Sequence, residues 1–198
     1  MGGIRITLEE KDLVAALQEG RQTAFKSLVQ RYQDRMYHVC LSFLPSKDDA
    51  EDLVQEVFIE VFRSIHSFRG ESALSTWMHR IAVSKALEVL RYRKRQKREA
   101  FFKGLLGLDT IKEETKEWNH PGILMEDQER GRILYAAIDK LPDNQKIAFS
   151  LRQIQGMSQK ETAEVMGVSE KAVESYQIRA KQNLRSALGA YYQQNMKD

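Results

Sequence analysis

The sequence predicts an all-α protein made of two helical domains joined by a flexible linker. Only three prolines interrupt its 198 residues, and apolar residues recur at three- and four-residue steps over most of the chain. This periodicity is lost over Glu99–Asp127, a stretch of mixed charge that contains several glycines. We therefore expect a first domain over 1–98, a linker over 99–127 and a second domain over 128–198.

Charge is distributed unevenly along the chain. The formal net charge is +3, yet Asp48–Glu60 is acidic and Arg91–Arg98 is densely basic. Such a separation favours two partners of opposite charge. A single cysteine, Cys40, excludes a disulfide framework and favours a reducing compartment. No apolar run has the length of a membrane span, so we expect a soluble, cytoplasmic protein without direct membrane insertion.

The first domain is expected to open with two helices. Thr7 and Glu10 have the spacing of a capping box and predict a helix over Thr7–Glu19. Apolar residues continue at helical spacing over Thr23–Leu44, and Pro45 ends that second helix. Each helix has one broad apolar side, which indicates a shared core.

The next predicted helix, Ser46–Ile65, has two contrasting faces. One face is an apolar stripe that we expect in the core: Leu53, Val54, Val57, Phe58, Val61, Phe62 and Ile65. The other face is mostly acidic: Asp49, Asp52, Gln55, Glu56, Ile59 and Glu60. A solvated surface is the ordinary interpretation of such charges. Their single sign, and the apolar Ile59 among them, instead favour a docking surface for a basic protein.

A long basic helix is predicted over Trp77–Arg98. Six of its last eight residues are Lys or Arg. Cations favour the C-terminus of a helix, so a solvated helix end is one interpretation. Six cations are more than that purpose requires, and Trp77, His79 and Tyr92 add rings that can stack on bases. The pattern favours nucleic-acid binding.

The second domain ends in a pair of helices over Met157–Lys181. Ser158 and Glu161 form a capping box for the first helix, Gly167 ends it, and Ser169 caps the second. Helix pairs of this size with a glycine turn are typical of helix-turn-helix DNA readers, although a helical hairpin inside a core is the simpler alternative. Two segments before the pair also have helical spacing of apolar residues: Glu126–Asp139 and Asp143–Gln155.

Together these motifs resemble the extracytoplasmic-function (ECF) sigma factors, a class of the sigma-70 family of bacterial RNA polymerase specificity subunits. The resemblance covers nearly the whole chain outside the linker. It lies in segments similar to the family's clamp-binding helix, promoter-melting segment and second DNA-binding domain. These segments are Asp49–Phe58, Phe68–Ser72, Thr76–Met78, Arg80–Ala82, Leu141–Pro142 and Gly156–Leu184.

The resemblance implies core RNA polymerase as a partner, at its β′ clamp and β flap, with promoter DNA and an anti-sigma factor as further partners. The linker would run near the RNA exit path. Residues implied in polymerase docking are Asp49, Asp52, Gln55, Glu56 and Ile59. Those implied at the minus-ten element are Phe68, Arg69, Trp77, His79, Arg80, Ser84, Arg91, Arg93, Lys94 and Arg95. Those implied at the minus-thirty-five element are Ser169, Lys171, Glu174, Ser175, Arg179 and Lys181.

Some positions depart from the family pattern. Ser84 stands where many members have an asparagine that helps to read the minus-ten strand, and serine is shorter with one donor. Glu174 stands where lysine or arginine is common. A glutamate in the groove can accept from cytosine N4 but repels phosphate. Tyr176 stands where arginine is frequent, and we expect its ring to pack in the core.

Two other classes of function fit parts of the sequence. A stand-alone helix-turn-helix regulator would bind an operator as a dimer, but it would need a receiver or ligand domain in place of this all-helical first half. An all-α enzyme would need a convergent group of titratable side chains, whereas the four histidines are scattered. We therefore predict a promoter-specificity subunit that is not an enzyme, with no catalytic residue, metal site or cofactor.

Overall fold

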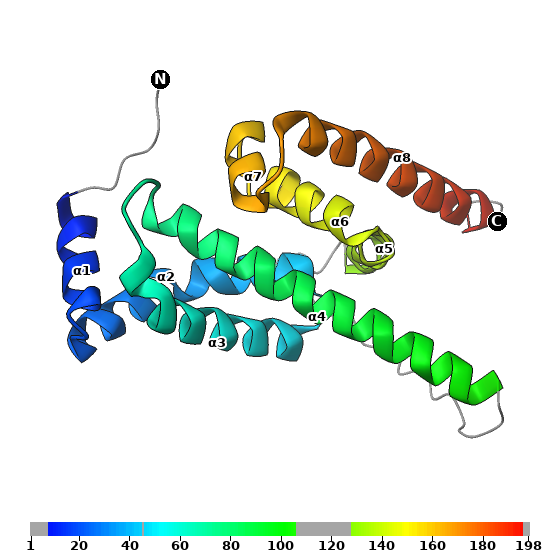
Figure 1. Ribbon diagram of the computed structural model, residues 1–198. Coiled ribbons are helices and arrows are strands. Elements are labelled where there is room, and N and C mark those ends of the chain that lie inside the picture. Colours follow the sequence, from blue (N-terminus) through cyan, green and yellow to red (C-terminus); the bar gives the residue numbers. More distant parts are fainter. Residues whose placement is uncertain (1–7, 45, 106–127, 196–198) are drawn as a thin grey trace.

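The computed structural model describes residues 8–44, 46–105 and 128–195, and within them the chain forms helices and no strand (Figure 1). This confirms the predicted all-α class. Thr7, Pro45 and most of the predicted linker lie outside the described residues, so the domain boundaries stay predictions. The elements are α1 Leu8–Gln18, α2 Gln22–Phe43, α3 Lys47–Ser64, η1 Ile65–Ser67, α4 Leu74–Leu105, α5 Gln128–Asp139, α6 Asp143–Phe149, η3 Ser150–Ile154, α7 Gln159–Met166 and α8 Glu170–Asn195.

The first four helices build the main core. α2, α3 and α4 pack side by side, and α1 lies across one end of them (Figure 1). Their apolar faces meet because each repeats at helical spacing. The side chains that are almost completely buried include Leu28, Met36, Val39, Phe43, Val57, Val61, Leu74 and Met78.

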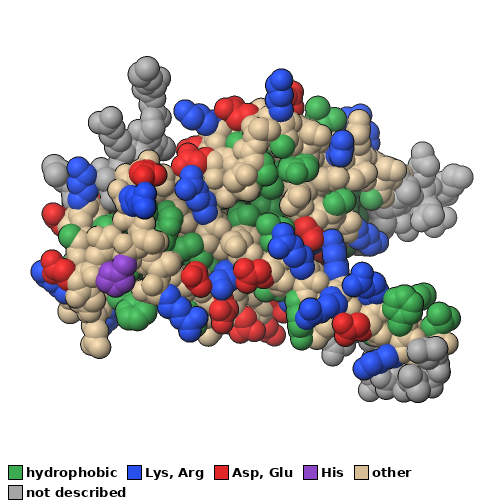
Figure 2. Space-filling model, in the orientation of Figure 1, with side chains coloured by type: hydrophobic (Ala, Val, Ile, Leu, Met, Phe, Trp, Pro, Cys, Tyr) green, Lys and Arg blue, Asp and Glu red, His purple; other side chains and the backbone are tan. Residues whose placement is uncertain are grey.

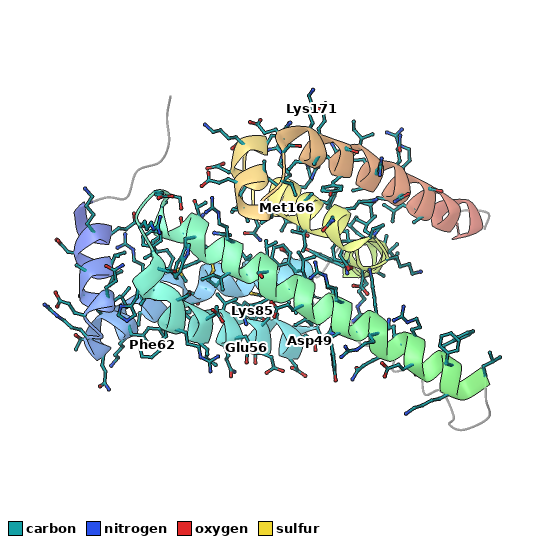
Figure 3. The ribbon with its side chains drawn as sticks, viewed as in Figure 1. Asp49, Glu56, Phe62, Lys85, Met166 and Lys171 are labelled. Atoms are coloured by element: carbon teal, nitrogen blue, oxygen red, sulfur yellow. The ribbon has the colours of Figure 1, made fainter. Side chains whose placement is uncertain are left out.

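α3 begins where the sequence predicts, but its buried face differs from the prediction at one residue. The Ser46 hydroxyl accepts a hydrogen bond from the backbone N–H of Asp49 at 3.2 Å, which caps the helix. The expectation that Phe62 lies in the core is wrong, since this side chain is 56% exposed. Phe62, labelled in Figure 3, lies at the edge of the apolar stripe. Its ring meets that of Phe25 edge-on, with centroids 5.2 Å apart.

α4 is longer than expected and projects beyond the bundle. The helix continues to Leu105, past the expected end at Arg98, so the first residues of the predicted linker are helical. Its buried residues lie between Leu74 and Leu90. The projecting end carries exposed apolar side chains among cations (Figure 2), namely Phe101, Phe102 and Leu105.

The C-terminal unit, α5 to α8 with η3, contains the predicted helix pair. The Ser158 hydroxyl accepts from the Glu161 N–H at 3.2 Å, and the Glu161 carboxylate accepts from the Ser158 N–H at 2.8 Å. This is the predicted capping box. Gly167 ends α7 in the left-handed conformation, with φ of 65°. These local features determine where α7 begins and ends.

η3 is a turn of π-helix where a regular helix was expected over Asp143–Gln155. The backbone N–H of Gln155 donates to the carbonyl of Ser150 at 2.9 Å, five residues back. The Ser150 hydroxyl faces α2 and donates to the carbonyl of Ser42 at 2.8 Å. The wider π-turn thus occurs where the chain contacts α2. Helical periodicity in the sequence does not indicate such a turn.

The C-terminal unit packs against the first four helices. Ile147, Leu151 and Val165 belong to the same apolar core as α2 and α4, and Met157 and Met166 lie against it. A smaller core within the unit contains Ala137, Ile138, Leu141, Ala180 and Leu184. The two halves of the chain therefore share buried surface, which the sequence left open.

Substitution of Gly167 tests whether its left-handed conformation requires a glycine. Gly167→Ala should lower the free energy of unfolding by about 1 kcal/mol, because an alanine is strained at positive φ. Gly189→Ala is the matched control, since Gly189 lies inside α8 with open space around it and gains about 0.5–1 kcal/mol of helix propensity. Urea unfolding of both variants measures the difference, and equal shifts would contradict the account.

Candidate docking and nucleic-acid interfaces

The exposed face of α3 is acidic around an apolar centre. We define the acidic face as Asp52, Gln55, Glu56 and Ile59. All of these side chains are exposed, and Ile59 is 42% exposed. They lie opposite the buried stripe that fixes the helix in the core. Acidic side chains gather at this edge of the molecule (Figure 2). Carboxylates around an exposed isoleucine suit a basic protein partner that brings an apolar contact.

Two acidic residues of α3 instead pair with α4. Asp49 lies 2.5 Å from the Arg93 guanidinium, and Glu60 lies 3.3 Å from the Lys85 ammonium. The Asp49 side chain is 17% exposed. Asp49 and Arg93 were both predicted to bind partners, yet each has an internal ion-pair partner here. The sequence does contain a signal for this pairing, because the segment that forms α3 is acidic and the segment that forms α4 is basic.

The ring of Trp77, in the first turn of α4, packs on the buried ring of Phe68 in the segment before the helix. Phe68 is 6% exposed, and its ring lies 5.2 Å from that of Trp77. Gln18 of α1 donates to the carbonyls of Phe68 and Ile65 at 3.0 and 3.1 Å. Phe68 was predicted to contact DNA; its side chain lies in the core of this structure, and the DNA contact stays a prediction. Gln18 is a positioning residue that sequence patterns did not reveal.

His79, which was also predicted to contact DNA, is buried in this structure, and its DNA contact stays a prediction. It is 1% exposed, its Nδ1 donates to the carbonyl of Ser75, and its Nε2 has no partner. Burial lowers the pKa of His79 to about 4. The neighbouring charges come from Arg35 of α2 and Glu161 of α7.

The basic stripe of α4 is the side that carries Arg80, Ser84, Arg91, Lys94 and Arg95. These residues recur at helical steps and are exposed. The Arg95 guanidinium lies 5.4 Å from the centroid of the Tyr92 ring. Arg69, in the preceding loop, is exposed as well. Cations and exposed rings along one helix can bind phosphates and stack on unpaired bases.

Both ends of the basic stripe contact the C-terminal unit. Arg80 lies 2.9 Å from the carboxylate of Glu164 in α7 and also donates to the Glu164 carbonyl at 3.1 Å. Lys94 lies 2.8 Å from Asp143 at the start of α6. Ser84 and Arg91 lie between these contacts. The sequence did not predict that these helices would meet.

α8 presents polar residues on its outer side. The Ser169 hydroxyl accepts from the backbone N–H of Ala172 at 3.2 Å, the predicted cap. Figure 3 shows Lys171 pointing away from the rest of the molecule. Tyr176 is half-buried, with its hydroxyl 3.5 Å from the Asn144 amide. The remaining predicted groove residues are exposed or, for Ser175, half-buried: Lys171, Glu174, Ser175, Arg179 and Lys181.

Three features of the described residues bear on other classes of site. No group of three or more His, Cys, Asp or Glu side chains within them could hold a metal ion. No described helix is long and apolar enough to cross a membrane. Burial raises the pKa of the Cys40 thiol to about 12, so this thiol is protonated at neutral pH and unreactive.

Known proteins match both halves of the chain. The family model for sigma-70 region 2 matches residues 28–97, and the model for sigma-70 region 4 matches residues 131–184. The ECF RNA polymerase sigma-E factor of Escherichia coli strain K12 is 35% identical over 182 residues, covering 88% of this chain and 92% of that protein. The sigma-E factor of Haemophilus influenzae is 34% identical and covers 91% of this chain and 96% of its own length.

Solved structures share the arrangement of helices. CnrH, solved in complex with the cytosolic domain of CnrY, matches with a TM-score of 0.61 and 27% identity over 90% of this chain and 96% of its own. The sigma factor RpoE of Bartonella quintana, solved with the anti-sigma factor NepR, matches with a TM-score of 0.63. This second match has 22% identity over 83% of this chain and 96% of its own, and it shows a similar fold alone.

The buried His79 makes stability depend on pH. Its pKa is about 4 in the folded chain and 6.5 as the ordinary value, so the unfolded chain binds more protons between these pH values. The free energy of unfolding should therefore be undiminished above pH 6.5 and fall by about 3 kcal/mol as the pH drops towards 4. Urea unfolding at several pH values measures this loss. His79→Gln should remove most of it, and an unchanged pH profile in that variant would contradict the account.

Proposed function

The chain belongs to the extracytoplasmic-function sigma factors of the sigma-70 family, the promoter-specificity subunits of bacterial RNA polymerase, and we propose how its surfaces divide that work. The acidic face of α3 binds core polymerase, the basic stripe of α4 binds the minus-ten element, and α8 binds the minus-thirty-five element. The observation that carries this assignment is the separation of charge. Exposed acids cluster along α3 at Asp48, Glu51, Asp52 and Glu56, whereas exposed cations cluster along α4 at Arg91, Lys94, Arg95, Lys97 and Arg98 and along α8 at Lys171, Arg179, Lys181 and Arg185.

The acidic face suits the basic coiled coil of the polymerase β′ clamp. Asp52 and Glu56 supply charge that steers association, and Ile59 supplies the apolar contact that excludes water. Asp49 acts from within the molecule, because its carboxylate is paired with Arg93. The C-terminal unit would contact the β flap. An anti-sigma factor is a further expected partner, since family members are commonly held inactive by one.

The minus-ten element would meet the loop before α4 and the basic stripe. Trp77 is half-buried on Phe68, so its ring is fixed where it can hold the end of the duplex open. Extrusion of a base costs a few kcal/mol, which stacking and edge contacts must offset. Ser84 is exposed on the same helix and offers one short donor to a base. Arg69, Arg91 and Arg95 would hold phosphates.

α8 would enter the major groove of the minus-thirty-five element. Lys171, Glu174 and Arg179 are exposed on its outer side. Arg179 can donate to guanine, whereas Glu174 can accept from cytosine N4. Lys181 suits a phosphate contact. The chemistry of RNA synthesis belongs to the polymerase, and we place this chain in the cytoplasm with it.

Run-off transcription tests the proposed function. Core polymerase with this chain and fragments of the host genome should give transcripts from a restricted set of promoters, and core polymerase alone should not. The shared promoter sequence would identify the two elements. Tight operator binding without polymerase, with no promoter-specific transcripts, would instead support a stand-alone regulator.

Charge reversal on α3 tests polymerase docking. The double variant Asp52→Lys, Glu56→Lys should weaken binding to core polymerase by roughly tenfold or more, because like charges then meet. Both side chains are exposed, so the thermal unfolding midpoint should change little. Asp12→Lys on α1 is the control, an exposed acid away from the acidic face. Equal affinity of the double variant and the control would refute the docking assignment.

Loss of the Trp77 ring tests strand opening. Trp77→Ala should leave the closed promoter complex intact but lower the equilibrium for opening by roughly thirtyfold, the equivalent of about 2 kcal/mol of stacking. Permanganate reactivity of thymines in the bubble measures opening. A thermal melt should show that the variant remains folded. Normal reactivity in a folded variant would rule out this role.

A further inference from the structure

Ile178 is an exposed apolar side chain in the middle of the outer side of α8. It is 51% exposed, and among the side chains described on α8, over 170–189, it is the only large apolar one that is exposed. Residues four and seven positions away share its side of the helix, because these steps complete one and two turns. All four of them are polar or charged and exposed, namely Lys171, Glu174, Gln182 and Arg185. The family resemblance implied a role for Lys171 and Glu174 but not for Ile178.

Buried contacts fix the rotation of α8 about its own axis and so determine that Ile178 points outward. Val173 and Ala180 have no exposed surface. The buried Gln177 side chain donates to the carbonyl of Ala148 in α6 at 2.6 Å. These residues lie on the side of the helix that faces the rest of the C-terminal unit. A rotation that buried Ile178 would break the Gln177 hydrogen bond and expose Val173.

The position of Ile178 along α8 matches the part of a recognition helix that contacts bases. A lone exposed isoleucine is common on protein surfaces and by itself indicates nothing. This one lies in the third turn of the helix proposed to enter the major groove, and the first turns of such a helix carry the base contacts. The major groove displays one apolar group on its base edges, the C5-methyl of thymine.

The charges around Ile178 favour DNA over a protein partner. On α3 the exposed Ile59 lies among acids, which suits a basic protein. On α8 the exposed charges near Ile178 are mostly cations, which suit the phosphates along both edges of the groove: Lys171, Lys181 and Arg185. Figure 3 shows Lys171 pointing away from the rest of the molecule, where a duplex can reach it.

We propose that Ile178 selects thymine in the minus-thirty-five element by covering its C5-methyl group. This inference rests on the proposed assignment of α8 to that element, and it adds an apolar contact to the polar contacts of Glu174 and Arg179. Contact between the two apolar groups removes both from water, and one buried methyl group corresponds to roughly fourfold in affinity. Adenine, guanine and cytosine have no methyl group in the major groove, so the gain is specific to thymine.

Glu174 lies one helical turn before Ile178 and restricts where the thymine can lie. Four residues of helix span roughly 6 Å, whereas successive base pairs are about 3.4 Å apart. The two side chains therefore reach base pairs about two steps apart at most. Because Glu174 can accept from cytosine N4, we expect a cytosine and a thymine within about two base-pair steps of each other in the minus-thirty-five element.

Promoter selection measures the thymine preference. Core polymerase with the full chain is given promoters that are randomised over the minus-thirty-five element, and the bound fragments are sequenced. The unmodified chain should enrich thymine roughly fourfold over each other base at one position near the selected cytosine. Ile178→Ala should lose this enrichment, and Ile178→Val, which keeps a branched apolar side chain, should retain most of it. Leu134→Ala is the matched control, because Leu134 is an exposed apolar side chain of α5.

Replacement of the selected thymine by deoxyuridine isolates the methyl group, since the two bases differ only at C5. Deoxyuridine should weaken promoter binding by the unmodified chain with core polymerase about fourfold, and by Leu134→Ala to the same extent. It should leave binding by Ile178→Ala unchanged. A thermal melt should show that Ile178→Ala remains folded, because the side chain that it truncates is exposed.

Three results would overturn the proposal. The first is a selected element without thymine, and the second is a deoxyuridine effect that is absent from the unmodified chain or equal in Ile178→Ala. The third is weaker binding of Ile178→Ala to core polymerase in the absence of DNA, which would show a protein contact instead. All three are distinct from failure of the proposed function, for which run-off transcription would give no promoter-specific transcripts.

Discussion

Lysine and arginine side chains of α4 form ion pairs with acidic residues of α3 and of the C-terminal unit. These ion pairs connect the two halves of the molecule. Arg93 and Lys85 pair with Asp49 and Glu60 of α3, whereas Arg80 and Lys94 pair with Glu164 and Asp143 of the C-terminal unit. Cationic side chains spaced so closely along one helix repel one another unless acidic side chains or phosphates lie nearby. The position of α3, the position of the C-terminal unit and the groups available to DNA all depend on how these cations are shared.

The local features of the fold were predictable from sequence because they depend on neighbouring residues. The Ser46 cap, the capping box of Ser158 and Glu161, and the left-handed Gly167 each follow from short-range geometry. The wide buried stripe of α3 follows from its periodicity. The same patterns carried the family resemblance, which the matches over residues 28–97 and 131–184 confirm.

Tertiary contacts decided the features that the sequence did not reveal. Phe68 and His79 have residue types that suit DNA, but the packing of α1, α2 and α7 buries them. The π-turn at Ser150 occurs where the chain meets α2, a contact between residues 108 positions apart. The helix also extends past Arg98, because mixed charge does not itself end a helix. Contacts distant in sequence leave no periodic signal.

Three surfaces of the chain are assigned to three partners, and site-specific photocrosslinking tests that division most directly. A photoreactive residue in place of Ile59 should crosslink to the polymerase β′ clamp in an initiating complex, and one in place of Ser84 should crosslink to the non-template strand of the minus-ten element. Crosslinks from position 59 to DNA, or from position 84 to the clamp, would contradict the account.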